Sequence, residues 1–106
     1  MTIPKQQRLS LGHTRRMDEI VLSVPGYDSA HGVVAPVEGG TVSVEIVDGS
    51  VEIFGDRAGL RDLARWCLAL SDERAPSGAH IHLDPGTFPL SLESAPLMLA
   101  RDPQER

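Results

Sequence analysis

The residues best suited to chemistry are His80, His82 and Asp84, which alternate with two aliphatic residues in the segment 79–84. On a β-strand, alternate side chains lie about 6.5–7 Å apart on one face, so both imidazoles and the carboxylate would face the same way. Such a set can bind a divalent metal ion, as in a small metal-binding protein or a hydrolase. It can equally form the solvent-exposed face of a strand whose aliphatic side lies in the core. The sequence contains no clear fourth ligand, so both interpretations stay open.

A second group, Asp28, Ser29 and His31, contains the residue types of a hydrolytic triad. These residues lie too close together in the chain for all three side chains to meet, and their composition favours a turn. The sequence has no nucleophile elbow, glycine-rich phosphate loop, dinucleotide-binding fingerprint or C-x-x-C pair. We therefore expect a protein that is not an enzyme and that needs no cofactor.

The clearest structural signal lies in residues 41–54, which predict a β-hairpin. Residues 41–47 and 50–54 alternate in polarity, as half-buried strands do, and Asp48-Gly49 between them suits a two-residue type I′ turn. The turn sets the register of the two strands. In that register Glu45 lies opposite Glu52, and the pairs on the inner face are aliphatic: Val44 with Ile53 and Ile46 with Val51.

The facing glutamates are unusual, because like charges directly opposite each other destabilise a sheet slightly. One interpretation is that both carboxylates extend into water, and the other is an acidic surface that serves a basic partner or a cation. Residues 17–56 contain eight acidic residues and no Lys or Arg, in a chain of net charge −5. An acidic segment of this length disfavours nucleic acid as a ligand and favours a basic protein surface.

Residues 56–71 predict one amphipathic helix, with Asp56 suited to cap its first turn. Apolar residues recur along one stripe that we expect to be buried, and the polar residues Arg57, Arg61, Asp62 and Arg65 fall away from it. The stripe consists of Leu60, Leu63, Ala64, Cys67 and Leu70, with Cys67 as an inert buried thiol. Trp66 lies at the edge of the stripe, where it would cover the core with its indole N–H turned outward. An alternative role for Trp66 is that of an anchor in an interface.

The whole pattern predicts an α+β fold, with a mostly antiparallel sheet of about four to six strands and one amphipathic helix packed on one face. Alternation predicts further strands in residues 17–24 and 79–84 and a short strand or an ordered loop at 88–92. We also expect brief pairing at 33–35 and a last strand in residues 96–101, where Pro96 is tolerable at the start. We expect a single α+β domain over residues 17–101, between a flexible basic tail over residues 1–16 and a polar tail over residues 102–106. No apolar run could cross a bilayer and no signal peptide is recognisable, so we expect a cytoplasmic protein without a membrane partner.

Several of these segments resemble one known protein family. The segments are Val44-Glu45-Ile46, Val51-Glu52-Ile53-Phe54-Gly55, Gly59-Leu60-x-x-Leu63-Ala64, His80-Ile81-His82-Leu83-Asp84 and Pro96-Leu97-Met98-Leu99. Together, over residues 41–101, they resemble immunity protein family 32, whose members are small proteins associated with bacterial polymorphic toxin systems.

The resemblance implies a cytoplasmic α+β protein that binds a cognate toxin domain with a basic surface and blocks it without catalysis. Under this hypothesis the candidate partner-binding residues are Glu45, Glu52, Trp66, His80, His82 and Asp84. Two alternatives remain: metal binding through His80, His82 and Asp84, and a generic protein-interaction domain.

Overall fold

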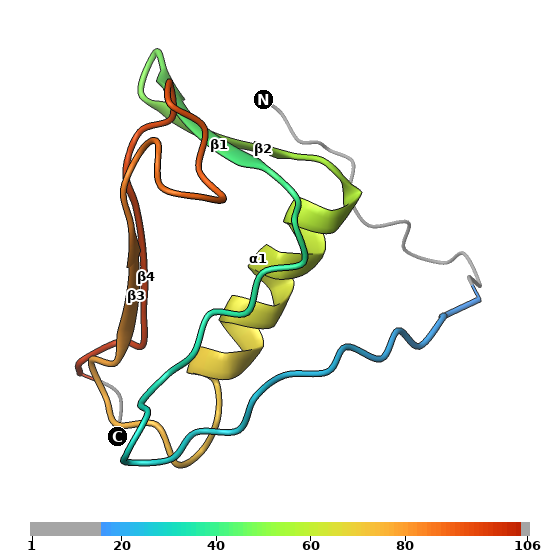
Figure 1. Cartoon of the computed structure of the whole chain (residues 1–106), viewed down its shortest axis with the longest axis vertical. Coiled ribbons are helices and arrows are strands. Elements are labelled where there is room, and N and C mark those ends of the chain that lie inside the picture. The colour runs from blue at the N-terminus through green and yellow to red at the C-terminus, as the bar shows by residue number, and fades with distance from the viewer. Residues whose placement is uncertain (1–15, 105–106) are drawn as a thin grey trace.

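The structure, a computed structural model of the chain, describes residues 16–104. Its elements in chain order are β1 (Val42–Val47), β2 (Ser50–Gly55), α1 (Arg57–Leu70), β3 (His80–Leu83) and β4 (Leu97–Ala100), as Figure 1 shows. The predicted α+β class is confirmed. The four strands of this part of the chain are at the low end of the predicted number. They form two antiparallel pairs, β1–β2 and β3–β4, rather than one sheet.

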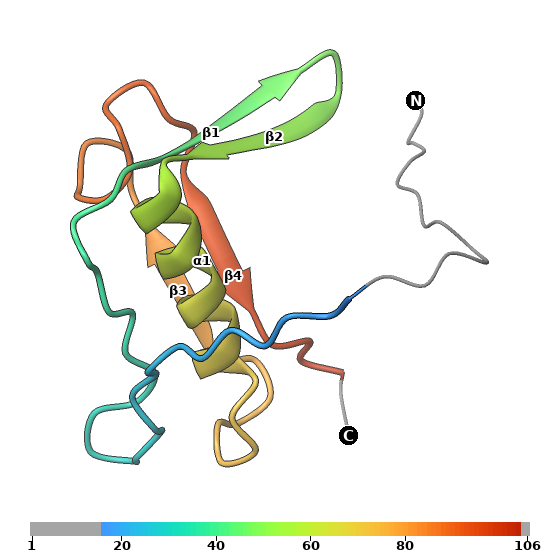
Figure 2. The same cartoon turned by 90° about the vertical axis from the view of Figure 1, so that its right-hand side faces the viewer.

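The helix α1 and the β3–β4 pair lie side by side, and the β1–β2 hairpin lies across one end of both (Figures 1 and 2). Two groups of buried side chains hold these parts together, one beneath the hairpin and one between α1 and β3. The first consists of Val42, Val44 and Leu90, and the second of Trp66, Leu70 and Ile81. Leu83 packs against both groups, so the core is continuous from the hairpin to the helix.

The hairpin has the predicted register, with Glu45 opposite Glu52. Its turn is also as predicted, because the backbone φ is +50° at Asp48 and +81° at Gly49, the left-handed values that a type I′ turn requires. The outer edge of β1 is bonded to the segment 89–95 through the backbone of Val42 and Val44. These bonds reach only the half of the hairpin that is nearer to the helix.

Residues 17–24 and 33–35, predicted to form a strand and a brief pairing respectively, form no strand. In residues 17–24, Met17 and Val21 are both 90% exposed, and neither β-sheet provides a neighbouring strand for this segment. An alternating sequence becomes a stable strand only when it has such a partner. In residues 33–35, Val33 and Ala35 instead pack against the group around Trp66. Residues 88–92 form a loop, in which Leu90 makes one bridge to Val42.

The helix begins after Asp56 as predicted, and Leu70 of the predicted stripe is buried, but most of the buried face differs from the predicted one. Leu60 and Cys67 of the predicted stripe are exposed, and Cys67 lines a surface hollow of about 360 Å³. Around the helix axis, the buried side chains lie roughly 100° away from the predicted stripe, which is the angle between two consecutive residues of a helix. They belong to Asp62, Arg65, Trp66, Ala69 and Leu70. The cause is the segment 33–40, which runs along this face of α1 and covers it (Figure 2).

Most of the predicted basic tail, residues 1–15, and the end of the predicted polar tail, residues 105–106, lie outside the described residues. The expectation that no segment crosses a membrane can be compared with the structure for residues 16–104. Among them, no helix has both the length and the apolar character that crossing a bilayer requires.

Candidate functional site

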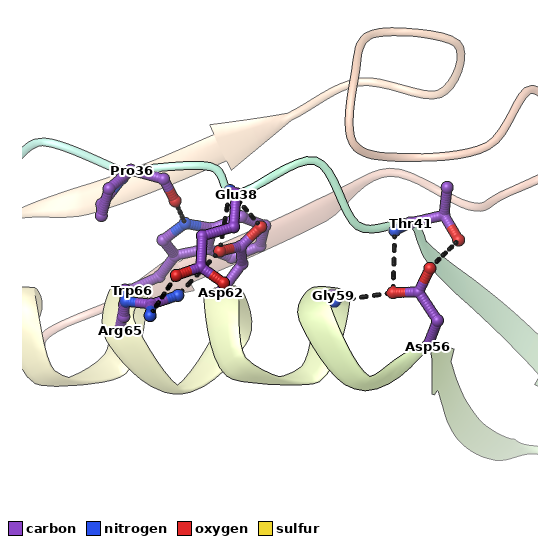
Figure 3. Close-up of polar contacts among 8 residues, drawn as sticks. All are labelled: Pro36, Glu38, Thr41, Asp56, Gly59, Asp62, Arg65 and Trp66. Atoms are coloured by element: carbon purple, nitrogen blue, oxygen red, sulfur yellow. Dashed lines mark hydrogen bonds and ion pairs between the residues drawn. The ribbon is translucent and has the colours of Figure 1, made fainter. Parts of the chain in front are cut away.

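A polar cluster holds the segment before β1 against α1 (Figure 3). It consists of the buried side chains of Asp62 and Arg65 and the half-exposed side chain of Glu38. The fully buried carboxylate of Asp62 accepts hydrogen bonds from the Glu38 amide at 2.9 and 3.1 Å and from Arg65 Nη1 at 3.1 Å. Arg65 Nη2 in turn donates to Glu38 Oε2 at 2.6 Å. Each charge of the cluster therefore has an opposite charge within hydrogen-bond distance, which is the condition for burying charges in a stable fold. We assign this cluster to folding rather than to binding.

Trp66 lies in the same region, and its placement differs from the prediction. Its side chain is fully buried, and indole Nε1 donates to the Pro36 carbonyl oxygen at 2.7 Å (Figure 3). The expectation that the N–H turns outward is therefore wrong, because the segment 33–40 supplies an acceptor that the helix pattern does not reveal. A side chain without exposed surface cannot contact a partner in this arrangement, so Trp66 is left out of the surface proposed below.

Asp56 joins the start of the helix to the base of the hairpin (Figure 3). Its Oδ1 accepts hydrogen bonds from the Gly59 amide at 2.7 Å and from the Thr41 amide at 3.2 Å. The Gly59 amide, followed by that of Thr41, lowers the pKa of Asp56, because both bonds stabilise the charged carboxylate. The backbones pack closely here, and a Cβ atom at Gly59 would overlap the Thr41 carbonyl oxygen. The base of the hairpin is thereby fixed on α1.

Beyond this base, the hairpin projects from the body of the molecule (Figure 2). Glu45 and Asp48 are exposed and Glu52 is partly exposed, so neither of the facing glutamates is buried. The hairpin contains no Lys or Arg, and none of its three carboxylates forms an ion pair within residues 16–104. The hairpin is therefore a locally negative surface whose charges are not neutralised by the described part of the chain.

The hairpin also exposes apolar side chains. Of the predicted inner pairs, only Val44 is buried, whereas Ile46 is 67% and Val51 65% exposed. The reason is that the segment 89–95 bonds to β1 only as far as Val44. Further exposed apolar side chains of the hairpin are Val47, Ile53 and Phe54. Apolar side chains beside charged groups on a projecting element are typical of a protein interface.

His80, His82 and Asp84 are exposed on the side of β3 that faces away from the core. His82 Nε2 lies 3.5 Å from Asp84 Oδ1, and His80 Nδ1 lies 3.3 Å from the Gly78 carbonyl oxygen. Across residues 16–104, no group of three or more His, Cys, Asp or Glu residues is arranged to hold a metal ion. The histidines lie on the β3–β4 pair and the glutamates on β1–β2, so the structure does not bring all candidate contacts onto one sheet.

Asp28 and His31 lie in a local turn, as predicted. The Asp28 carboxylate accepts hydrogen bonds from the amides of Ala30 and His31 at 2.9 Å, and it lies 3.0 Å from His31 Nδ1. The His31 amide and then its side chain lower the pKa of Asp28, because these contacts favour the charged carboxylate. Bonds of this kind, from a carboxylate to amides two and three residues later, belong to a turn rather than to a catalytic triad.

Comparison with known protein families gives a match over half of the chain. The family model described as immunity protein 32 matches residues 50–102, which is half of the chain. The match contains β2, α1, β3 and β4, and it begins inside the hairpin, directly after the turn. No curated protein and no solved structure matches the chain.

Proposed function

The chain belongs to the immunity protein 32 family, and on this basis we propose that it binds a cognate bacterial toxin domain and neutralises it. The chain belongs to a polymorphic toxin system and acts in the cytoplasm of the cell that it protects. Neutralisation results from covering a functional surface of the toxin, so the protein needs no catalytic group and no cofactor.

The projecting hairpin is the observation that supports a contact surface best. It presents three carboxylates that form no ion pair within residues 16–104, together with the exposed side chains of Val51 and Ile53 on β2. A partner with a basic surface would approach these carboxylates faster through long-range attraction. The apolar side chains would then lose contact with water in the complex, which stabilises it.

His80, His82 and Asp84 form a second candidate contact area, on the other sheet. Their polar groups can donate and accept hydrogen bonds at the margin of an interface, where contacts position the partner more than they add affinity. We therefore expect substitutions in this area to weaken toxin binding less than substitutions in the hairpin.

The proposal predicts a toxin domain encoded beside this gene, and growth of cells that express this domain tests it. Co-expression of the native chain should restore growth, and the purified chain should inhibit the toxin in proportion to its amount, with complete inhibition at equimolar concentration. Such a titration is the property of a binding inhibitor. Inhibition far below equimolar amounts would indicate catalysis, and growth arrest despite expression of the folded chain would contradict neutralisation.

A further inference from the structure

The two edges of the hairpin differ in their hydrogen bonds. On the outer edge of β1, the Val42 amide donates to the Pro89 carbonyl oxygen at 3.1 Å, and the Val44 carbonyl oxygen accepts from the Ala95 amide at 2.7 Å. The Val44 amide also donates to Ser94 Oγ at 2.8 Å. This edge is therefore covered by the segment 89–95 up to Val44.

The outer edge of β2 is open. In an antiparallel pair, residues alternate between those that bond to the partner strand and those whose backbone groups point away from it. Val44 bonds outward, so its pairing residue Ile53 also points its N–H and C=O outward, on the opposite edge. The same alternation places the backbone groups of Val51 on that edge. No described segment bonds to them, since β2 pairs only with β1.

We propose that an extended segment of the toxin partner adds to β2 as a third strand. This inference rests on the proposed function and specifies how the partner binds. The added strand exchanges backbone hydrogen bonds with Val51 and Ile53, and its apolar side chains cover those two residues. Strand addition of this kind supplies affinity through the backbone and specificity through alternate side chains.

The carboxylates indicate the chemistry of that strand. The backbone N–H and C=O of Glu52 bond to β1 and therefore do not bond to the added strand. Glu52 and the residue opposite it on the added strand form a non-hydrogen-bonded pair, in which the side chains lie close together. The side chain opposite Glu52 would also approach Glu45, which lies on the same face one strand further. A Lys or Arg at this position of the partner is attracted by both carboxylates, and an acidic residue is repelled.

A second copy of this chain fits the edge less well. It would bring three further carboxylates onto the same small sheet, and neither hairpin contains a basic residue to compensate them. A charged residue in the middle of an exposed edge strand is also a common device that prevents self-association. The strands β3 and β4 have four residues each against six for β2, so they offer shorter edges.

Proline substitutions at two residues that pair across the hairpin test the proposal. Ile46 and Val51 face each other and are almost equally exposed, but their amides point to opposite edges. Proline removes the amide hydrogen, so Val51→Pro blocks the β2 edge and Ile46→Pro blocks the β1 edge, while the bonds between β1 and β2 are retained. The probe is the toxin domain encoded beside this gene, inactivated by substitution of its catalytic residue and titrated calorimetrically.

Val51→Pro should weaken binding by about tenfold or more, which corresponds to the loss of one backbone hydrogen bond and its neighbours, whereas Ile46→Pro should change binding by less than about threefold. An equal loss of affinity for the toxin domain in the two variants, or no loss of affinity in either, would overturn the proposal. If the native chain itself does not bind the toxin domain, the proposed function fails and not the mode of binding.

Amide hydrogen exchange of the native chain gives a second test that does not depend on the folding of a variant. In the free chain, the amides of Val51 and Ile53 should exchange quickly, because they bond to no described segment. In the complex both should become protected, while the Ile46 amide stays unprotected. Rapid exchange at Val51 and Ile53 in a saturated complex, or a free chain that sediments as a dimer through this edge, would refute strand addition by the toxin.

Discussion

The polar cluster on α1 and the β1–β2 hairpin both contain carboxylates, but these differ in burial and in their partners. Asp62 is fully buried and bonded to Arg65 and to the Glu38 amide. On the hairpin, Glu45 and Glu52 face each other beside exposed apolar side chains, and neither forms an ion pair with a residue of the described part of the chain. The comparison teaches that carboxylates which hold segments together have an oppositely charged partner within the fold. The carboxylates of the hairpin lack such a partner in the described chain, which makes the hairpin the part best suited to bind another molecule.

The largest expected effect comes from breaking the polar cluster. Replacement of Asp62 by Ala leaves Arg65 Nη1 and the Glu38 amide without their buried acceptor, which should lower the free energy of unfolding by about 3–5 kcal/mol. The exposed carboxylate of Asp84 provides the matched control, because Asp84→Ala should change this free energy by less than about 0.5 kcal/mol. Urea denaturation measures both. Similar losses in the two variants would show that the cluster is not a structural element.

The contact between the helix and the hairpin base gives the next largest effect. Replacing Gly59 by Ala in an open helix would raise stability, because alanine favours the helix. Here the added Cβ overlaps the Thr41 carbonyl oxygen, so we expect a loss of about 1–3 kcal/mol in the free energy of unfolding. Cys67→Ala, on the exposed face of the same helix, serves as the control. A stabilising effect of Gly59→Ala would mean that the hairpin base is not fixed on α1 as described.

Acid should weaken the same junction. The pKa of Asp56 is lowered below its ordinary value of 3.8, so its charged form contributes stability at neutral pH that is lost as the pH falls through the lowered pKa. Asp56→Asn lacks this titration, and its stability deficit against the native chain should therefore shrink as the pH falls below 3.8. Urea midpoints measured from neutral to acidic pH test this, and a deficit that does not vary with pH would contradict it.

Zinc should have the smallest effect. His80, His82 and Asp84 belong to no group that is arranged to hold a metal ion in the described residues, so we expect no saturable heat when zinc is titrated into the chain. The same chain with His82→Ala is the control for nonspecific binding. Saturable heat that this substitution abolishes would support the metal-binding alternative and would make the β3–β4 face, rather than the hairpin, the functional region.

Much of the fold follows from local sequence rules. The Asp48-Gly49 turn, the register that places Glu45 opposite Glu52, and the Asp56 cap depend on neighbouring residues, and all three are confirmed. The buried face of α1 could not be predicted in this way. Asp62 is buried because its partner Glu38 lies 24 residues earlier in the chain, and Trp66 because Pro36 accepts its N–H. No helical periodicity contains this information.

The candidate site likewise contains some features that neighbouring residues determine and others that depend on residues far apart in the chain. The carboxylates of the hairpin could be recognised from the sequence, since turn and alternation determine which residues face each other. The exposure of Ile46 and Val51 could not, because it depends on how far the segment 89–95 extends along β1. That extent is set by long-range packing, and it determines how much of the β1 edge is covered.

The most direct test of the central claim, that the hairpin binds the toxin, is a comparison of two charge-reversal variants. The first carries Glu45→Lys with Glu52→Lys, and the second carries Glu73→Lys with Glu93→Lys, which changes the net charge equally at two exposed positions outside the hairpin. Calorimetric titration with the inactivated toxin domain should show binding weakened by about tenfold or more in the first variant and by less than about threefold in the second. Equal affinities of the two variants for the toxin domain would contradict the account.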